Sequence, residues 1–123
     1  LVVPVIRDTN SKTISEISGE VKSLSEAAKR GDLGPDDFMG GTFTISILGS
    51  VDGFTPILNQ AQVGLLGVGR SLQKPVVRDG EVVVREMMTL SLTGDHQVVD
   101  GAMAASFFRR LQRLIESPSK LFA

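Results

Sequence analysis

The sequence predicts an α/β fold, with one helix near the start, a central region of strands and a second helix near the end. Apolar residues recur at helical spacing over residues 14–30 and again over residues 101–117. Between these stretches, β-branched and aromatic residues alternate with hydroxyls, and the dipeptide Asp79-Gly80 separates two valine-rich arms. This is the pattern of strands and a hairpin.

The composition fits one folded unit over residues 1–123 and excludes several classes of protein. Hydrophobic residues make up 41% of the chain, and a formal net charge of -1 provides no basic field for nucleic acid. No cysteine is present, which excludes disulfides, thiolate zinc sites and a cysteine nucleophile. No apolar run approaches the roughly 20 residues that cross a bilayer. We therefore expect a soluble protein that binds neither nucleic acid nor membranes.

The first elements are a strand and a helix. Residues 1–6 are apolar and strand-like and begin without a polar lead-in, so we expect the chain to be a fragment of a longer protein. Thr13 and Glu16 match a capping box, which predicts a helix over residues 14–30. Gly31 can end it in the left-handed conformation.

The central region predicts several strands. Residues 40–49 form an alternating strand that carries Ser46, and residues 62–68 form a short buried strand. Residues 76–84 form a hairpin, whose second arm is expected to continue through Met87 and Leu92 toward His96. The final helix covers residues 101–117 and stops before Pro118. Its predicted inner face comprises Ala104, Phe108, Leu111 and Ile115.

The candidate for chemistry is the only histidine, in the segment Asp95-His96-Gln97-Val98-Val99-Asp100-Gly101. Histidine exchanges a proton near neutral pH, although a lone histidine beside aspartates is more often a surface or packing residue. A serine hydrolase is disfavoured because Gly-x-Ser-x-Gly does not occur, and the glycines of residues 64–69 have the wrong order for a dinucleotide loop. One histidine and two aspartates supply too few ligands for a recognised metal site, so no metal is expected.

Six separated segments, occurring in this order, strengthen the case for His96 as a catalytic residue: residues 3–8, 40–46, 54–57, 66–69, 87–92 and 95–101. Together they resemble the C-terminal half of the catalytic domain of dihydrolipoyl acyltransferases, the core components of 2-oxo acid dehydrogenase complexes. The last segment resembles the family pattern Asp-His-Arg-x-x-Asp-Gly, which is related to the histidine motif of chloramphenicol acetyltransferase. The resemblance implies a two-layer α/β sandwich with a mixed β-sheet covered by helices, of which only the C-terminal half is present.

The resemblance also implies roles for three residues. His96 would be the general base that removes a thiol proton, and Ser46 would stabilise the tetrahedral oxyanion with its hydroxyl. Asp100 would hold the active-site segment in shape through an ion pair, although it could equally cap the final helix. Asp95 is expected to be structural. The coenzyme A contacts are not assigned and would lie partly in the absent N-terminal half.

The implied reaction moves an acyl group between coenzyme A, as a substrate, and a lipoyl group carried covalently on a separate lipoyl domain. The implied partners are that lipoyl domain and the decarboxylase and dihydrolipoyl dehydrogenase components. The resemblance further implies a homotrimer, with His96 facing a neighbour's Ser46, and a possible cubic or dodecahedral core of 24 or 60 subunits. The expected location is the bacterial cytoplasm or the mitochondrial matrix.

Two departures from the family pattern stand near the proposed site. Gln97 replaces the usual arginine, and Ile47 replaces the asparagine or serine common after Ser46. Gln97 is the only support for one alternative, a non-catalytic scaffold subunit of such a complex. An acetyltransferase for a small free acceptor is a separate alternative. The sequence leaves the acyl group open between acetyl and branched-chain acyl, with succinyl less favoured.

Overall fold

The computed structural model describes residues 2–122, which divide into two compact units: one up to Thr42 and one from Phe43 onward. Within the described residues, no helix is long and apolar enough to span a membrane. The same residues include no group of three or more histidine, cysteine or acidic side chains that could hold a metal ion.

The first unit is built around helix α1, Ile14–Arg30, which confirms the predicted bounds. The Thr13 hydroxyl accepts the backbone N–H of Glu16 at 3.2 Å, and the Thr13 backbone N–H donates to the Glu16 carboxylate at 2.7 Å. These bonds from Thr13 hold the pKa of Glu16 below its ordinary value, because they stabilise the ionised carboxylate. Gly31 ends the helix with φ 74°, as predicted.

The prediction of a strand at the start of the chain is wrong for the described residues 2–6. They belong to no sheet, and the backbone N–H of Val5 donates to the carbonyl of Asp37 at 2.7 Å. The Arg7 guanidinium also ties this segment down, donating to the carbonyls of Asp36 at 2.6 Å and Met39 at 2.8 Å. An apolar β-branched run becomes a strand only where a partner supplies a ladder, and none is provided here.

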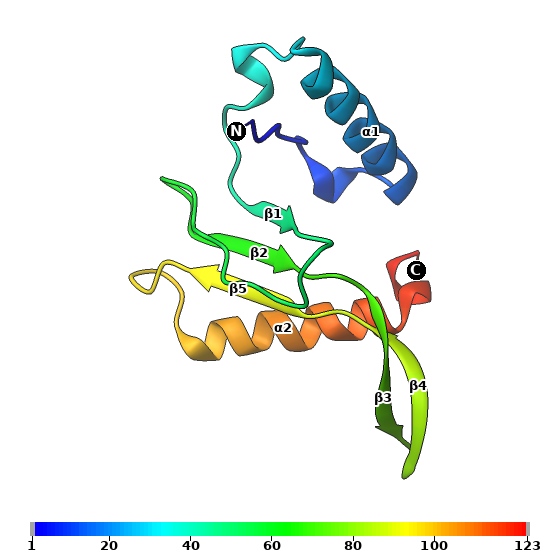
Figure 1. Ribbon diagram of the computed structural model, residues 1–123. Coiled ribbons are helices and arrows are strands. Elements are labelled where there is room, and N and C mark those ends of the chain that lie inside the picture. Colours follow the sequence, from blue (N-terminus) through cyan, green and yellow to red (C-terminus); the bar gives the residue numbers. More distant parts are fainter. Residues whose placement is uncertain (1, 123) are drawn as a thin grey trace. The chain divides into compact units, whose positions relative to one another are not determined.

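The second unit contains a mixed three-stranded sheet (Figure 1). Strand β1, Thr44–Ile47, pairs parallel with β2, Gly64–Val68, and β2 pairs antiparallel with β5, Leu90–Gly94. Helix α2, Gly101–Glu116, lies along one face of this sheet. The helix over the mixed sheet confirms the predicted α/β class. The best-buried apolar side chains, Leu65 and Leu66, belong to the central strand.

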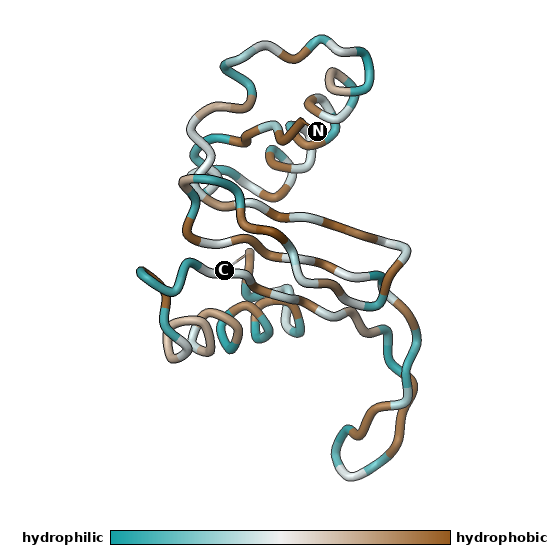
Figure 2. Tube along the Cα trace, turned by 60° about the vertical axis from the view of Figure 1, so that its left-hand side comes forward, coloured by the Kyte–Doolittle hydropathy of each residue, from teal (hydrophilic) through white to brown (hydrophobic). Residues whose placement is uncertain are grey.

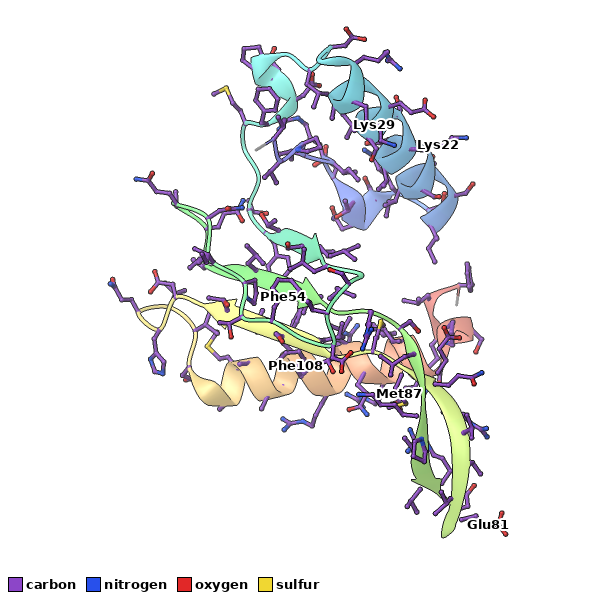
Figure 3. The ribbon with its side chains drawn as sticks, viewed as in Figure 1. Lys22, Lys29, Phe54, Glu81, Met87 and Phe108 are labelled. Atoms are coloured by element: carbon purple, nitrogen blue, oxygen red, sulfur yellow. The ribbon has the colours of Figure 1, made fainter. Side chains whose placement is uncertain are left out.

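A hairpin of β3, Leu72–Arg78, and β4, Glu81–Met87, extends away from the sheet to its tip near Glu81 (Figures 1 and 3). Its turn residues Asp79 and Gly80 have φ of 51° and 79°, which confirms the predicted turn. Hydrophobic residues follow both arms (Figure 2).

The prediction that the second arm runs on toward His96 is wrong. Strand β4 ends at Met87, and a separate strand starts at Leu90 and pairs with β2 instead of β3. The apolar run through Met87 and Leu92 is continuous in sequence, but its two halves find different partners. Periodicity shows that a segment is extended and does not show which neighbour it pairs with.

The inner face of α2 largely follows the prediction. Ala104, Phe108 and Leu111 are half-buried, but Ile115 is exposed and Leu114 is half-buried in its place. A step of three instead of four keeps the last turn on the same face. The helix ends at Glu116, and Pro118 begins a short 3-10 turn, Pro118–Leu121.

Candidate active site

The two faces of the sheet differ in chemistry. Side chains directly opposite one another across the register share a face, so Ile45, Leu66 and Leu92 form a row on one face. This is the face of α2, where Phe43 packs against Phe107 with ring centroids 6.0 Å apart. The opposite face carries small or polar residues on the two outer strands. Its members are Thr44, Ser46, Leu65, Gly67, Ser91 and Thr93.

A loop of residues 54–62 covers that opposite face. A Cβ added at Gly67 would lie 3.1 Å from the ring of Phe54 and 3.2 Å from Pro56, so the loop packs directly on the backbone of the central strand (Figure 3). The Thr93 hydroxyl donates to the carbonyl of Pro56 at 2.5 Å. A Cβ at position 67 would require Phe54 and Pro56 to move by a few tenths of an ångström.

Ser46 lies in the middle of β1 and shares a row with Gly67 and Ser91. Its side chain is half-buried, and its hydroxyl forms no hydrogen bond with any other residue of the described range 2–122. A hydroxyl without an internal partner remains available as a donor to a bound group. The neighbouring Ile47 is 68% exposed and points to the other face.

His96 lies in an exposed turn between β5 and α2, and Asp95 holds this turn together. The Asp95 carbonyl accepts the backbone N–H of Val98 at 2.9 Å and of Val99 at 2.8 Å. Its carboxylate accepts the backbone N–H of Gln97 at 2.9 Å. The carboxylate therefore has a local structural role, as in an Asx turn. The His96 side chain is presented outward from a turn of fixed backbone.

Asp100 caps helix α2 immediately after the turn. Its carboxylate accepts the backbone N–H of Met103 at 2.8 Å, and its carbonyl accepts that of Ala104 at 3.0 Å. Within residues 2–122, Asp100 is in none of the ion pairs, which join Lys12 to Glu20, Arg30 to Asp32 and Arg70 to Asp52. The capping interpretation of Asp100 is thus seen directly in these contacts.

The structure brings His96 and Asp100 to one turn but does not bring Ser46 to them. Ser46 is opposite Gly67 on β2, whereas Gly94, at the end of β5, is opposite Gly64. Two strand spacings and three residues along the strand separate the Cα atoms of Ser46 and Gly94 by roughly 14 Å. His96 lies beyond Gly94 and outside the sheet. Within one copy of the chain, His96 and the Ser46 hydroxyl do not form a site.

An apolar cavity of about 190 Å³ lies on the helix side of the sheet, next to the His96 turn. Gly94 and Val99 border it at the turn, and the rest of its lining comes from the sheet and α2. It is therefore on the face opposite Ser46. Its lining residues are Phe43, Val63, Gly64, Leu92, Gly94, Val99, Met103, Ala104 and Phe107.

Sequence reasoning missed one polar cluster near Ser46. Thr44 is the one polar side chain buried among the described residues, at 8% exposure. Its hydroxyl bonds to the side chains of Asn59 and Gln62, which come from the loop. The alternation of hydroxyls along β1 placed Thr44 on the same face as Ser46. No local signal marked its two partners, which lie 15 and 18 residues away.

Comparison with known proteins identifies the kind of domain to which this fold and this histidine turn belong: the catalytic core of an acyltransferase. Residues 1–123 match the family described as 2-oxoacid dehydrogenases acyltransferase (catalytic domain). The chain belongs to this family. It is 42% identical over 123 residues to the dihydrolipoyllysine-residue acetyltransferase component of pyruvate dehydrogenase complex from Staphylococcus aureus, covering 98% of this chain and 29% of that protein.

Solved structures give the same result. A crystal structure of Azotobacter vinelandii dihydrolipoamide acetyltransferase matches with a TM-score of 0.91 at 41% identity, over 99% of this chain and 51% of that one. A truncated catalytic core from Thermoplasma acidophilum matches with a TM-score of 0.81 at 37% identity, over 95% and 52%. The chain thus spans about half the length of these structures. The Azotobacter study concerned the role of a serine, a histidine and an asparagine in the catalytic mechanism.

Proposed function

We propose that the protein containing this chain transfers an acyl group between dihydrolipoamide and coenzyme A, with His96 as general base and Ser46 as oxyanion donor. The observation that carries the proposal is the exposed His96, held in a turn by Asp95 and followed by the capped helix, in a chain of this family. In the Azotobacter enzyme the asparagine lies four positions after the histidine, and the serine lies 52 positions before it. Here Asp100 lies four positions after His96, and Ser46 lies 50 positions before it.

The chemistry begins with the thiol of the acceptor. A thiol with a pKa near 8.5 is mostly protonated at neutral pH, so its proton passes to the neutral imidazole of His96 as the sulfur attacks the thioester carbonyl. The carbonyl oxygen becomes an oxyanion, which accepts a hydrogen bond from Ser46. The intermediate then breaks the original carbon–sulfur bond. The departing thiolate takes the proton back from the imidazolium, so the enzyme returns to its starting state.

The proposed site joins two copies of the chain, with His96 from one and Ser46 from its neighbour. The separation of roughly 14 Å between Ser46 and Gly94 in one copy supports this arrangement. In a closed ring, each copy presents His96 to one neighbour and Ser46 to the other, so every histidine meets a serine. Three copies form the proposed trimer. A matching solved structure is that of the cubic core of the pyruvate dehydrogenase multienzyme complex, which supports assembly of such trimers into a larger core.

The proposed substrates are a lipoyl group on a separate lipoyl domain and coenzyme A. The names of the Staphylococcus aureus and Staphylococcus epidermidis relatives favour the acetyl group. The partners in this proposal are the decarboxylase that loads the lipoyl group and the dehydrogenase that reoxidises it.

The decisive experiment supplies the assembled protein with dihydrolipoamide and compares acetyl-, isobutyryl- and succinyl-coenzyme A as donors. We expect transfer from acetyl-coenzyme A, and a loss of about 10²–10⁴-fold in kcat for His96→Ala, measured by the appearance of the acyl thioester. Wild-type turnover in His96→Ala would overturn the mechanism. An assembled wild-type protein with no transfer from any donor would favour a scaffold subunit, an outcome consistent with Gln97 in place of the family arginine.

A further inference from the structure

The cluster around Thr44 connects the strand of Ser46 to the loop above it. The Thr44 hydroxyl donates to Oε1 of Gln62 at 2.6 Å and accepts from Nδ2 of Asn59 at 2.9 Å. This buried hydroxyl therefore both donates and accepts a hydrogen bond within the cluster. Bonds of this kind are specific in direction as well as distance, so they fix the position of the loop against β1.

The loop holds its two bonding side chains in a tight and strained turn. The backbone N–H of Gln62 donates to the carbonyl of Asn59 at 3.1 Å, which closes the turn over residues 59–62. Inside it, Ala61 has φ 64°, in the left-handed region that a residue with a Cβ seldom adopts. Such a conformation persists where its surroundings impose it, and the paired bonds to Thr44 are such a constraint.

The cluster lies next to the proposed oxyanion donor. Thr44 and Ser46 are two residues apart on β1, so their side chains share the face that the loop covers. The loop is attached at Thr44 through its turn and at Thr93 through the carbonyl of Pro56. Both attachments belong to the row of Thr44, Leu65 and Thr93, and the row of Ser46, Gly67 and Ser91 is the next one on the same face. A shift of either attachment would move the loop relative to the Ser46 hydroxyl.

We propose that Thr44, with Asn59 and Gln62, is a positioning residue for the Ser46 hydroxyl in acyl transfer. This inference rests on the proposed function and adds a residue outside the predicted set of His96, Ser46 and Asp100. The one O–H of Thr44 is committed to Gln62 and the side chain is buried, so Thr44 is not a donor to substrate. It acts by keeping β1 and the covering loop at the spacing that aims Ser46. A displacement of about 1 Å at a reacting centre can cost about 10²-fold in rate.

The test compares Thr44→Val, which keeps the side-chain shape and removes the hydroxyl, with Thr44→Ser, which keeps the hydroxyl. In the assembled protein we expect Thr44→Val to lower kcat about 10- to 100-fold while KM changes less than about threefold. Thr44→Ser should restore kcat to within about threefold of wild type. Thr42→Val is the matched control, because Thr42 is exposed, lies just before the strand and is outside the cluster. It should leave both constants unchanged.

A second experiment distinguishes a positioning role of Thr44 from a general effect on stability. Thr44→Val introduced into Ser46→Ala should cause little further loss of kcat, because its effect operates through the Ser46 hydroxyl that is already absent. A Thr44→Val enzyme with wild-type kcat, or an equal additional loss in the Ser46→Ala background, would overturn the inference while leaving acyl transfer by the wild type intact. Failure of the wild type itself to transfer would overturn both proposals.

If Thr44→Val does not fold, Asn59→Ala provides the same comparison with one of the two bonds removed. We then expect a smaller fall in kcat that is again absent in the Ser46→Ala background. Circular dichroism and the melting transition establish which variants are folded before kinetics are compared.

Discussion

The turn that carries His96 and the strand that carries Ser46 are built in different ways. The turn is held mainly by neighbours in sequence: Asp95 accepts bonds from residues two to four positions ahead, and Asp100 bonds to Met103. One bond is distant, from the Asp95 backbone N–H to the carbonyl of Val63 at 3.0 Å. The strand is held by residues far away, because Thr44 bonds to Gln62 18 positions later and Ser46 pairs with Gly67, whose backbone lies against Phe54. One half of the proposed site is therefore mainly local, and the other depends on contacts between segments that are distant in sequence.

The largest expected effect concerns whether these two regions meet across copies of the chain. His96→Ala and Ser46→Ala subunits, each nearly inactive alone, should regain activity when co-expressed at equal levels. In randomly mixed trimers about one interface in four joins an intact His96 to an intact Ser46, so about a quarter of wild-type kcat should return. The measurement is acyl transfer per subunit in the purified mixed assembly.

The matched control places both substitutions on one chain and mixes it with wild type. A site between copies again gives about a quarter of the activity, whereas a site within one copy gives about half. A site within one copy would also give no recovery in the first mixture. That pair of results would contradict the proposed arrangement directly.

The next prediction compares how tightly the two regions are packed, using a glycine-to-alanine substitution in each. Gly67→Ala forces a Cβ to within 3.1–3.2 Å of Phe54 and Pro56, so we expect a loss of about 1–3 kcal/mol in the free energy of unfolding. Gly101→Ala, at the start of α2, meets nothing within 4 Å and should change stability by less than about 1 kcal/mol. Denaturant unfolding of the two variants measures the difference. Equal losses would mean that the covering loop yields readily to the added methyl group.

This difference also explains what the sequence could predict. The α1 bounds, the Thr13–Glu16 capping box and the Asp79-Gly80 turn were all predicted, because each depends on residues a few positions apart. Residues 2–6 were wrongly predicted as a strand, since a strand also needs a partner. The break between Met87 and Leu90 was missed because pairing with β2 decides it.

In the candidate site, too, only the contacts between residues close in sequence could be predicted. His96, Asp95 and Asp100 are adjacent in sequence, so their common turn could be anticipated. The distance between Ser46 and His96 follows from the strand order β1-β2-β5, which no local pattern contains. The partners of Thr44 were missed for the same reason: Asn59 and Gln62 carry no signal until the loop folds over the sheet.

The smallest expected effect concerns Asp100, which follows the His96 turn and caps helix α2. Asp100→Ala removes the acceptor for the Met103 N–H and should lower the free energy of unfolding by about 1 kcal/mol, whereas Asp100→Asn keeps an acceptor oxygen and should change it by less than about 0.5 kcal/mol. Because the Azotobacter enzyme has an asparagine four positions after its histidine, Asp100→Asn should also keep kcat within a few-fold of wild type. Unfolding and acyl transfer measured on the same two variants show whether Asp100 acts as a helix cap or through an ion pair. A folded Asp100→Asn protein with kcat reduced a hundredfold would show that the negative charge is needed, and so would support an ion pair over a cap.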